Sequence, residues 1–224
     1  MKTTFVAAAV AALALAACTR IPSDGIATRE IFARYEVVVS GGVAEARASF
    51  TVGEYSNTYL ELVRGDSVSC NGVPLRRDGS IIGEVHYSAT LPSQPDGYSF
   101  QLRRVGESIY TSVGGTSGLA ITSPAEGARV SISQPLQLRW TPGAGGARGV
   151  EVELDGVCTS RVSFTTNDQG RDAISPDQLV LRGASSCPAR LTLRRSVERV
   201  LAGPFAGGLA TSGEESSVAI TLVP

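Results

Sequence analysis

The sequence predicts an all-β protein whose body, after a leader helix at the N-terminus, forms two antiparallel β-sandwiches. Three observations support this fold class: short stretches of alternating apolar and polar residues, turn-forming pairs between them, and no long helical pattern after the leader. The composition, 42% hydrophobic and 18% charged, is that of a globular protein rather than a disordered one.

The alternating stretches predict the strands. In 44–52 the side chains of Ala44, Ala46, Ala48, Phe50 and Val52 take one face, and polar or charged residues take the other. Such alternation is typical of a strand with one buried face. The same period recurs in five later stretches, at 98–102, 136–140, 150–154, 191–193 and 218–222.

Turn signals separate these strands. Asn71-Gly72 lies between two short apolar runs and predicts a two-residue hairpin, because both residues tolerate a positive φ. Asp-Gly pairs at 78–79, 96–97 and 155–156 predict further turns. Ser175 followed by Pro176 predicts one isolated helical turn, with the serine as its cap and the proline at its first position.

A polar, glycine-rich segment at 114–118 predicts the boundary between two domains, at 28–115 and 118–224. Just after it, Pro124 and Gly127 precede the alternating run Leu136, Leu138 and Trp140. This stretch resembles the opening strands of Ig-like and fibronectin-type-III modules. The resemblance implies that Trp140 points inward and fills the core of the second domain.

The first residues predict a secretory leader. Lys2 supplies a positive charge, and the apolar stretch 5–17 would span about 20 Å as a helix, too short to cross a membrane stably. The stretch ends in Leu15-Ala16-Ala17-Cys18, which resembles the lipobox of bacterial lipoproteins.

That resemblance implies cleavage after a signal peptide at 1–17, followed by a tether at 18–27 that starts with a cysteine carrying diacylglycerol and a fatty acyl chain such as palmitate. In the Gram-negative lipoproteins that this leader resembles, an aspartate after the cysteine would favour the inner membrane. The resemblance therefore implies that Thr19 favours the outer membrane, with the body in the periplasm. The whole chain resembles two-domain, Ig-like outer-membrane lipoproteins. The alternative is an ordinary leader cut after Ala14 or Ala16, which would release a soluble periplasmic protein.

Three cysteines remain beside Cys18. Cys158 and Cys187 both fall in the second predicted domain, and an oxidising compartment favours a disulfide between them. Closing that loop should contribute about 3–4 kcal/mol in the chain-entropy description. Cys70 is expected to be a buried thiol, with pairing between two chains as the alternative.

The sequence offers few catalytic or metal-binding groups, and we predict no enzyme activity, no catalytic residue, no metal and no cofactor. His86 is the only histidine and Lys2 the only lysine, which excludes multi-histidine metal sites and, once the leader is removed, lysine chemistry. His86 is expected on a strand beside Glu84. The segment 167–172 is expected to be a turn rather than a calcium loop, because it lacks the downstream bidentate glutamate.

The predicted function is therefore that of a binding or structural module, held on the lipid bilayer through Cys18, with an envelope protein or a glycan as partner. The near-neutral net charge of −1 argues against nucleic acid. The alternative is a module that contacts carbohydrate or lipopolysaccharide through arginine and tyrosine side chains. The arginines could instead lie on solvated strand faces, and the tyrosines in the core or an interface. The candidate residues are Arg76, Arg77, Arg103, Arg104, Arg194, Arg195, Arg199, Tyr55, Tyr59 and Tyr87. A hydrolase would need His86 in a cleft beside a serine or Cys70.

Overall fold

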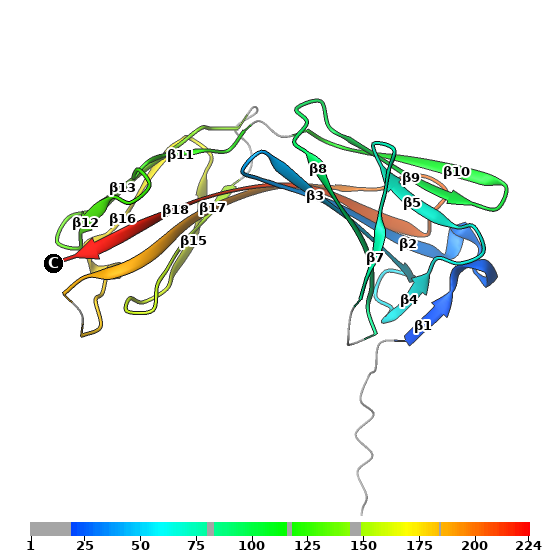
Figure 1. Cartoon of the computed structure of the whole chain (residues 1–224), viewed down its shortest axis with the longest axis horizontal. Helices are drawn as coiled ribbons and strands as arrows, with labels where there is room; N and C mark the ends of the chain where they lie inside the picture. Colours follow the sequence, from blue (N-terminus) through cyan, green and yellow to red (C-terminus); the bar gives the residue numbers. More distant parts are fainter. Residues whose placement is uncertain (1–18, 80–82, 116–117, 144–148, 184) are drawn as a thin grey trace, which may run out of the picture.

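The computed structural model describes residues 19–79, 83–115, 118–143, 149–183 and 185–224. These residues form strands, which are arranged in three sheets, and three short 3-10 helices (Figure 1). The all-β fold class predicted from the alternating pattern is confirmed. The leader at 1–18 lies outside the described residues.

The largest sheet has eleven strands and runs the whole length of the molecule (Figure 1). Its strands are β1 (Thr19–Pro22), β2 (Ile31–Ser40), β3 (Val43–Val52), β4 (Thr58–Glu61), β7 (Arg76–Gly79), β8 (Val85–Pro92), β12 (Arg129–Ser131), β14 (Gly149–Asp155), β15 (Val162–Asn167), β17 (Cys187–Val200) and β18 (Gly207–Val223).

Two smaller sheets pack against the ends of the large one. The four-stranded sheet contains β5 (Ser67–Cys70), β6 (Val73–Pro74), β9 (Tyr98–Arg104) and β10 (Glu107–Val113). The three-stranded sheet contains β11 (Ile121–Ser123), β13 (Leu136–Trp140) and β16 (Arg171–Ile174). The 3-10 helices are η1 (Ser23–Gly25), η2 (Thr28–Glu30) and η3 (Pro176–Gln178).

Each small sheet and the part of the large sheet that it covers enclose a separate hydrophobic core. In the first half, Tyr35 and Phe50 of the large sheet pack against Phe100 of the four-stranded sheet. In the second half, Leu138 of the three-stranded sheet shares a core with Val152 and Leu193 of the large sheet. Burying each of these side chains contributes about 1.5–3 kcal/mol, so the alternating positions are the main source of stability in both halves.

Two of the predicted local structures have the expected backbone, whereas the turn predicted at Asp78-Gly79 is wrong, because both residues lie in β7 and pair with β8. Asn71 and Gly72 adopt φ values of 47° and 80° between β5 and β6, because a two-residue hairpin requires positive φ at both positions. Ser175 precedes η3, with Pro176 as its first residue, and the Ser175 hydroxyl donates a hydrogen bond to Gln178 Oε1 at 3.2 Å. Both short-range predictions are confirmed.

The two long strands β17 and β18 belong to both halves. Residues 207–215 of β18 pair in parallel with β2, whereas residues 221–223 pair in parallel with β12. Ala210 therefore lies in the first core and Leu222 in the second. The domain boundaries at 28–115 and 118–224 stay a prediction, and the shared hairpin is a connection between the halves that the sequence pattern did not reveal.

Residues 19–27, which the sequence led us to expect as a tether, belong to the fold. Strand β1 pairs in parallel with β4, in the register Thr19 with Thr58 through Pro22 with Glu61. Pro22 had suggested a linker, but it ends a strand at the edge of the sheet, where a missing N–H is tolerated. Helix η1 follows directly, and Ser23 is fully buried.

Candidate functional site

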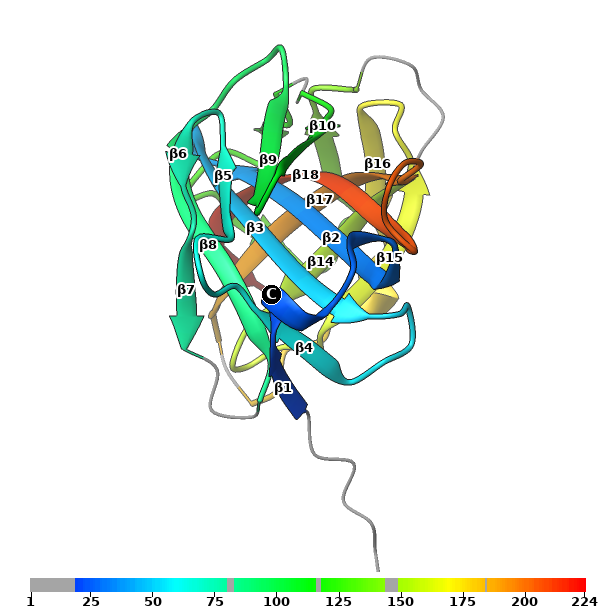
Figure 2. The same ribbon diagram turned by 90° about the vertical axis from the view of Figure 1, so that its right-hand side faces the viewer.

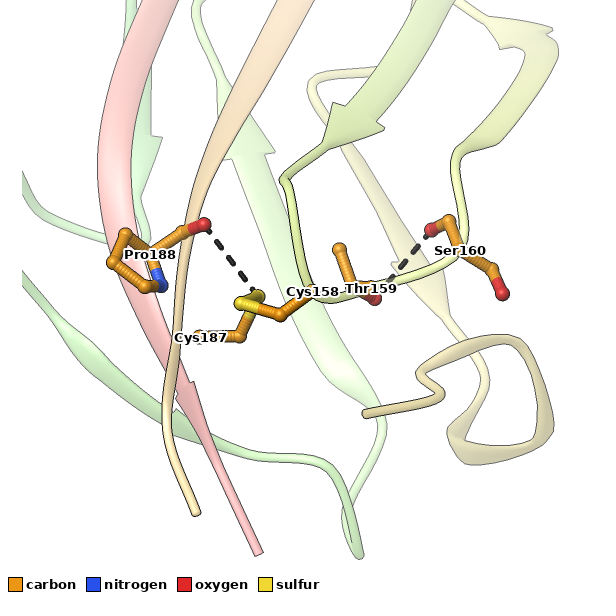
Figure 3. Close-up of a disulfide and its surroundings, with 5 residues drawn as sticks. All are labelled: Cys158, Thr159, Ser160, Cys187 and Pro188. Atoms are coloured by element: carbon orange, nitrogen blue, oxygen red, sulfur yellow. Dashed lines mark hydrogen bonds between the residues drawn. A yellow bond between two sulfur atoms is a disulfide. The ribbon is translucent and has the colours of Figure 1, made fainter. Parts of the chain in front are cut away.

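Of the residues singled out from the sequence, Cys18 lies outside the described residues, whereas the two cysteines of the predicted bridge are both described. Cys158 and Cys187 form a disulfide with a sequence separation of 29 (Figure 3). The bond fastens the turn after β14 to the first residue of β17. It therefore restrains the second half at the end farthest along β17 from the first half.

Trp140 is buried and is held by a polar group as well as by packing. Its indole Nε1 donates a hydrogen bond to Asp168 Oδ1 at 2.8 Å, and the backbone N–H of Gly143 donates to Asp168 Oδ2 at 2.9 Å. Burial alone would raise the pKa of Asp168, but the hydrogen bonds from Trp140, Arg195 and Gly143 hold it below its usual value. The acidic segment 167–172 thus supplies a structural carboxylate in a turn.

Arg195 on β17 joins this carboxylate to a second one. Its guanidinium lies 2.6 Å from Asp168 Oδ2, and its Nε donates to Glu214 Oε2 of β18 at 2.9 Å. Glu214 Oε1 in turn accepts hydrogen bonds from the backbone N–H groups of Gly118 and Leu119, at 2.6 and 3.2 Å. We call Asp168, Arg195 and Glu214 the junction triad, because it ties β17, β18 and the start of the second half together.

A second buried ion pair holds the N-terminal segment against the first half. Arg104 Nε lies 3.2 Å from Asp66 Oδ2, and Arg104 Nη2 donates to the backbone oxygens of Ser23 and Ile26 at 2.6 and 2.8 Å. An open hollow of about 490 Å³ lies beside this pair, lined in part by Asp24. The Arg104 guanidinium therefore binds β9 to the segment that follows β1.

The pair at 194–195 forms neither a shared anion site nor one solvated face, whereas Arg76, Arg77 and Arg199 are exposed, as expected of a solvated strand face. Arg194 is exposed and pairs with Glu153 and Glu215, while the adjacent Arg195 points inward. Neighbouring residues of a strand lie on opposite faces, so no two consecutive arginines can grip one ligand from the same side. A signal for this was present in the sequence, since Arg195 continues the inward series of Leu191 and Leu193.

The three tyrosines do not converge on one face either. Tyr87 is buried, and its hydroxyl accepts a hydrogen bond from the backbone N–H of Leu62 at 2.7 Å. Tyr59 lies half-buried against the ring of His86, with ring centroids 6.0 Å apart. Tyr55 is 93% exposed.

His86 and Cys70 lie in different environments. His86 is partly exposed, with its Nε2 3.0 Å from Glu84 Oε2, and lines an outer hollow with Arg34 and Arg47. Cys70 is a free thiol buried in the first core, where burial raises its pKa to about 12. Tyr87, which follows His86 on β8, points into that core. Because neighbouring residues of a strand lie on opposite faces, His86 points away from the core that holds the Cys70 thiol.

Strand β15 forms one edge of the large sheet. Within the described ranges it pairs with β14 and with no other strand. Its sequence, Val-Ser-Phe-Thr-Thr-Asn, holds neither a charged residue nor a proline. Edge strands usually carry such residues because they discourage pairing with another chain.

No three His, Cys, Asp or Glu side chains in the described ranges gather in a way that could hold a metal ion. No helix in that part of the chain is long and apolar enough to cross a bilayer.

Comparisons with known proteins give little further information. No family profile matches the chain, and no curated protein matches it. A weak structural match is to the "Structure of Yersinia pseudotuberculosis adhesin InvE", at 12% sequence identity and a TM-score of 0.23. The match covers 85% of this chain and 58% of that one, so this chain spans less than two thirds of its length. A likeness at this TM-score carries no argument about fold or function.

Proposed function

We propose that the protein is a lipid-anchored lipoprotein of the outer membrane, whose periplasmic body acts without catalysis as a binding module for another envelope protein. The observation that carries the binding role is the open edge of β15. Within the described ranges this six-residue strand pairs on one side only, so alternate residues turn their backbone N–H and C=O groups outward. Its β-branched and aromatic side chains favour the strand conformation. An extended segment of a partner can add to such an edge through main-chain hydrogen bonds.

The long hairpin of β17 and β18 supports this role mechanically. Because both strands run through both halves, a partner bound at β15 is held at a fixed position relative to the N-terminal end of the body. The junction triad reinforces that connection where the two halves meet. With the partner bound at β15 and the lipid anchor at the N-terminal end, the body would act as a rigid connector between the membrane and the partner protein.

Support for the anchor comes from the sequence Leu15-Ala16-Ala17-Cys18, which resembles a lipobox. Its test is metabolic labelling with an alkyne fatty acid, comparing the wild-type protein with Cys18→Ser. We expect label in the outer-membrane fraction for the wild type and none for the variant. Equal labelling of the two proteins would show that Cys18 is not the acylated residue.

The binding role is tested with a photo-cross-linking amino acid placed at exposed Thr165 on β15. The matched control is exposed Arg139 on β13, which pairs with Ser123 of β11 on one side and with Arg171 of β16 on the other. We expect a defined cross-linked protein in intact cells from position 165 alone. A second variant that adds Ser163→Lys should suppress it, because a charge on an edge strand opposes pairing. Cross-links of the same kind from both positions, or none from 165, would contradict the proposal.

A further inference from the structure

The chain is fixed to the body from the first residue after Cys18. The backbone N–H of Thr19 donates a hydrogen bond to the carbonyl of Asn57 at 3.0 Å, and residues 19–22 pair with β4. Beyond that strand, Arg104 holds the carbonyl oxygens of Ser23 and Ile26. Because Cys18 is joined to Thr19 by a peptide bond, no spacer lies between the candidate lipid anchor and the sheet.

The loop next to this point carries the most exposed aromatic side chain of the first half. Residues 53–57 connect β3 to β4, and Tyr55 is 93% exposed. Tyr55 lies two residues before Asn57, so its Cα is within about 7 Å of the residue that binds Thr19. Tyrosine is enriched where a membrane meets water, because its ring is apolar and its hydroxyl is polar.

Charge at this edge is balanced. Arg20 on β1 is exposed, with its Nε donating to the carbonyl of Gly83 at 3.1 Å, and Glu54 next to Tyr55 is exposed as well. One cation and one anion at the same edge give no strong preference for anionic lipids. Contact of this edge with a bilayer would therefore depend on the ring of Tyr55 and on the anchor.

We infer that the first half sits directly on the lipid headgroups, with the loop 53–57 in contact with the bilayer and the ring of Tyr55 inserted at the interface. This inference rests on the proposed acylation of Cys18. Acyl chains in the hydrocarbon layer keep Cys18 at its boundary, and the pairing of β1 with β4 brings the loop to the same level. Strand β10, which lies away from β1 in both views, then faces away from the membrane (Figures 1 and 2).

The test uses the mature, naturally acylated protein in vesicles of phosphatidylcholine with brominated acyl chains, which quench nearby indoles. Tyr55→Trp is the probe and Tyr110→Trp on β10 is the matched control, since Tyr110 is also exposed, at 67%. Buried Trp140 gives the same background in both variants. We expect the added indole of Tyr55→Trp to lose emission and shift to shorter wavelength, and that of Tyr110→Trp to do neither.

Flotation of the vesicles separates the two ideas. If the acylated protein floats with the vesicles but the two variants are quenched equally, the protein is anchored and the seating inference is wrong. If the protein does not float, or Cys18 carries no lipid, the proposed anchor itself fails, and the seating inference fails with it. A flexible Gly-Ser spacer inserted between Cys18 and Thr19 should preserve flotation and reduce the quenching of Tyr55→Trp. Undiminished quenching would show that the direct connection is not what holds the loop against the bilayer.

Discussion

Removing the guanidinium of the junction triad should destabilise the protein severely. Arg195→Met keeps the aliphatic stem but leaves Asp168 and Glu214 as buried carboxylates, with side chains 4% and 7% exposed. Breaking a buried ion pair by removing one partner costs about 3–5 kcal/mol, because the remaining charge is left without compensation. That is a large part of the roughly 5–15 kcal/mol by which folded proteins are stable.

The assay is urea unfolding followed both by circular dichroism and by Trp140 fluorescence, which reports on the triad through its bond to Asp168. The matched control is Arg194→Met on the same strand. Arg194 is 43% exposed, and its pairs with Glu153 and Glu215 should contribute about 1 kcal/mol or less.

A third variant separates lost charge balance from lost packing. Adding Asp168→Asn and Glu214→Gln to Arg195→Met removes the uncompensated charges and should recover part of the stability. If Arg195→Met unfolds at the same urea concentration as Arg194→Met, the triad does not hold the halves together and the reasoning is refuted.

The remaining predictions concern the disulfide, the free thiol, pH and the shared hairpin. Replacing Cys158 and Cys187 with alanine should lower the unfolding free energy by about 3–4 kcal/mol, measured by urea unfolding; an unchanged midpoint would contradict this. Cys70 should resist iodoacetamide at pH 8 in the folded protein and react after unfolding, because burial raises its pKa to about 12; mass spectrometry distinguishes the two states. The pKa of Asp168 is lowered on folding, so its contribution is complete above the unfolded value of about 3.9 and is lost as the pH falls through the lower folded value. Asp168→Asn should therefore flatten the loss of stability below about pH 4, as measured by melting at a series of pH values. A fragment ending at residue 118 lacks β18, the partner of β2, and should associate or unfold; a monomeric fragment with cooperative unfolding would support independent domains instead.

Features of the fold that depend on residues close together in the sequence could be predicted, and those that depend on distant segments could not. Alternation within a strand is a local property, so Phe50, Phe100 and Leu138 could be assigned to cores from the sequence. The same holds for the Asn71-Gly72 hairpin, whose backbone is set by the two residues themselves.

Pairing between distant strands has no such local signal. Nothing in residues 31–40 indicates that β2 pairs with β18 rather than with a strand of its own half. The stretch 194–200 is largely polar and shows no clear apolar face, so the extension of β17 into the first half was missed. Strand β1 was missed for a related reason, since four residues ending in proline resemble a linker.

The candidate site was predictable to a lesser degree. The pairing of Cys158 with Cys187 was predicted from the expected oxidising compartment and from the position of both cysteines in the second predicted domain. The inward direction of Arg195 and Arg104 could have been read from the alternation of their strands, but their acidic partners lie in other segments of the chain. The open edge of β15 depends on the arrangement of the whole sheet, which only the three-dimensional structure reveals.

The parallel pairing of β2 with β18 also sets the order in which the molecule can be completed. Phe32 pairs with Gly207, so one of the first strands to be synthesised finds its neighbour in the last strand of the chain. Contacts of such high sequence separation form slowly, and domains otherwise tend to fold from the N-terminus as synthesis proceeds. Until β18 is available, the edge of β2 stays open to pairing with other chains. A holding chaperone that delays folding until the whole chain is present would therefore increase the yield of native protein.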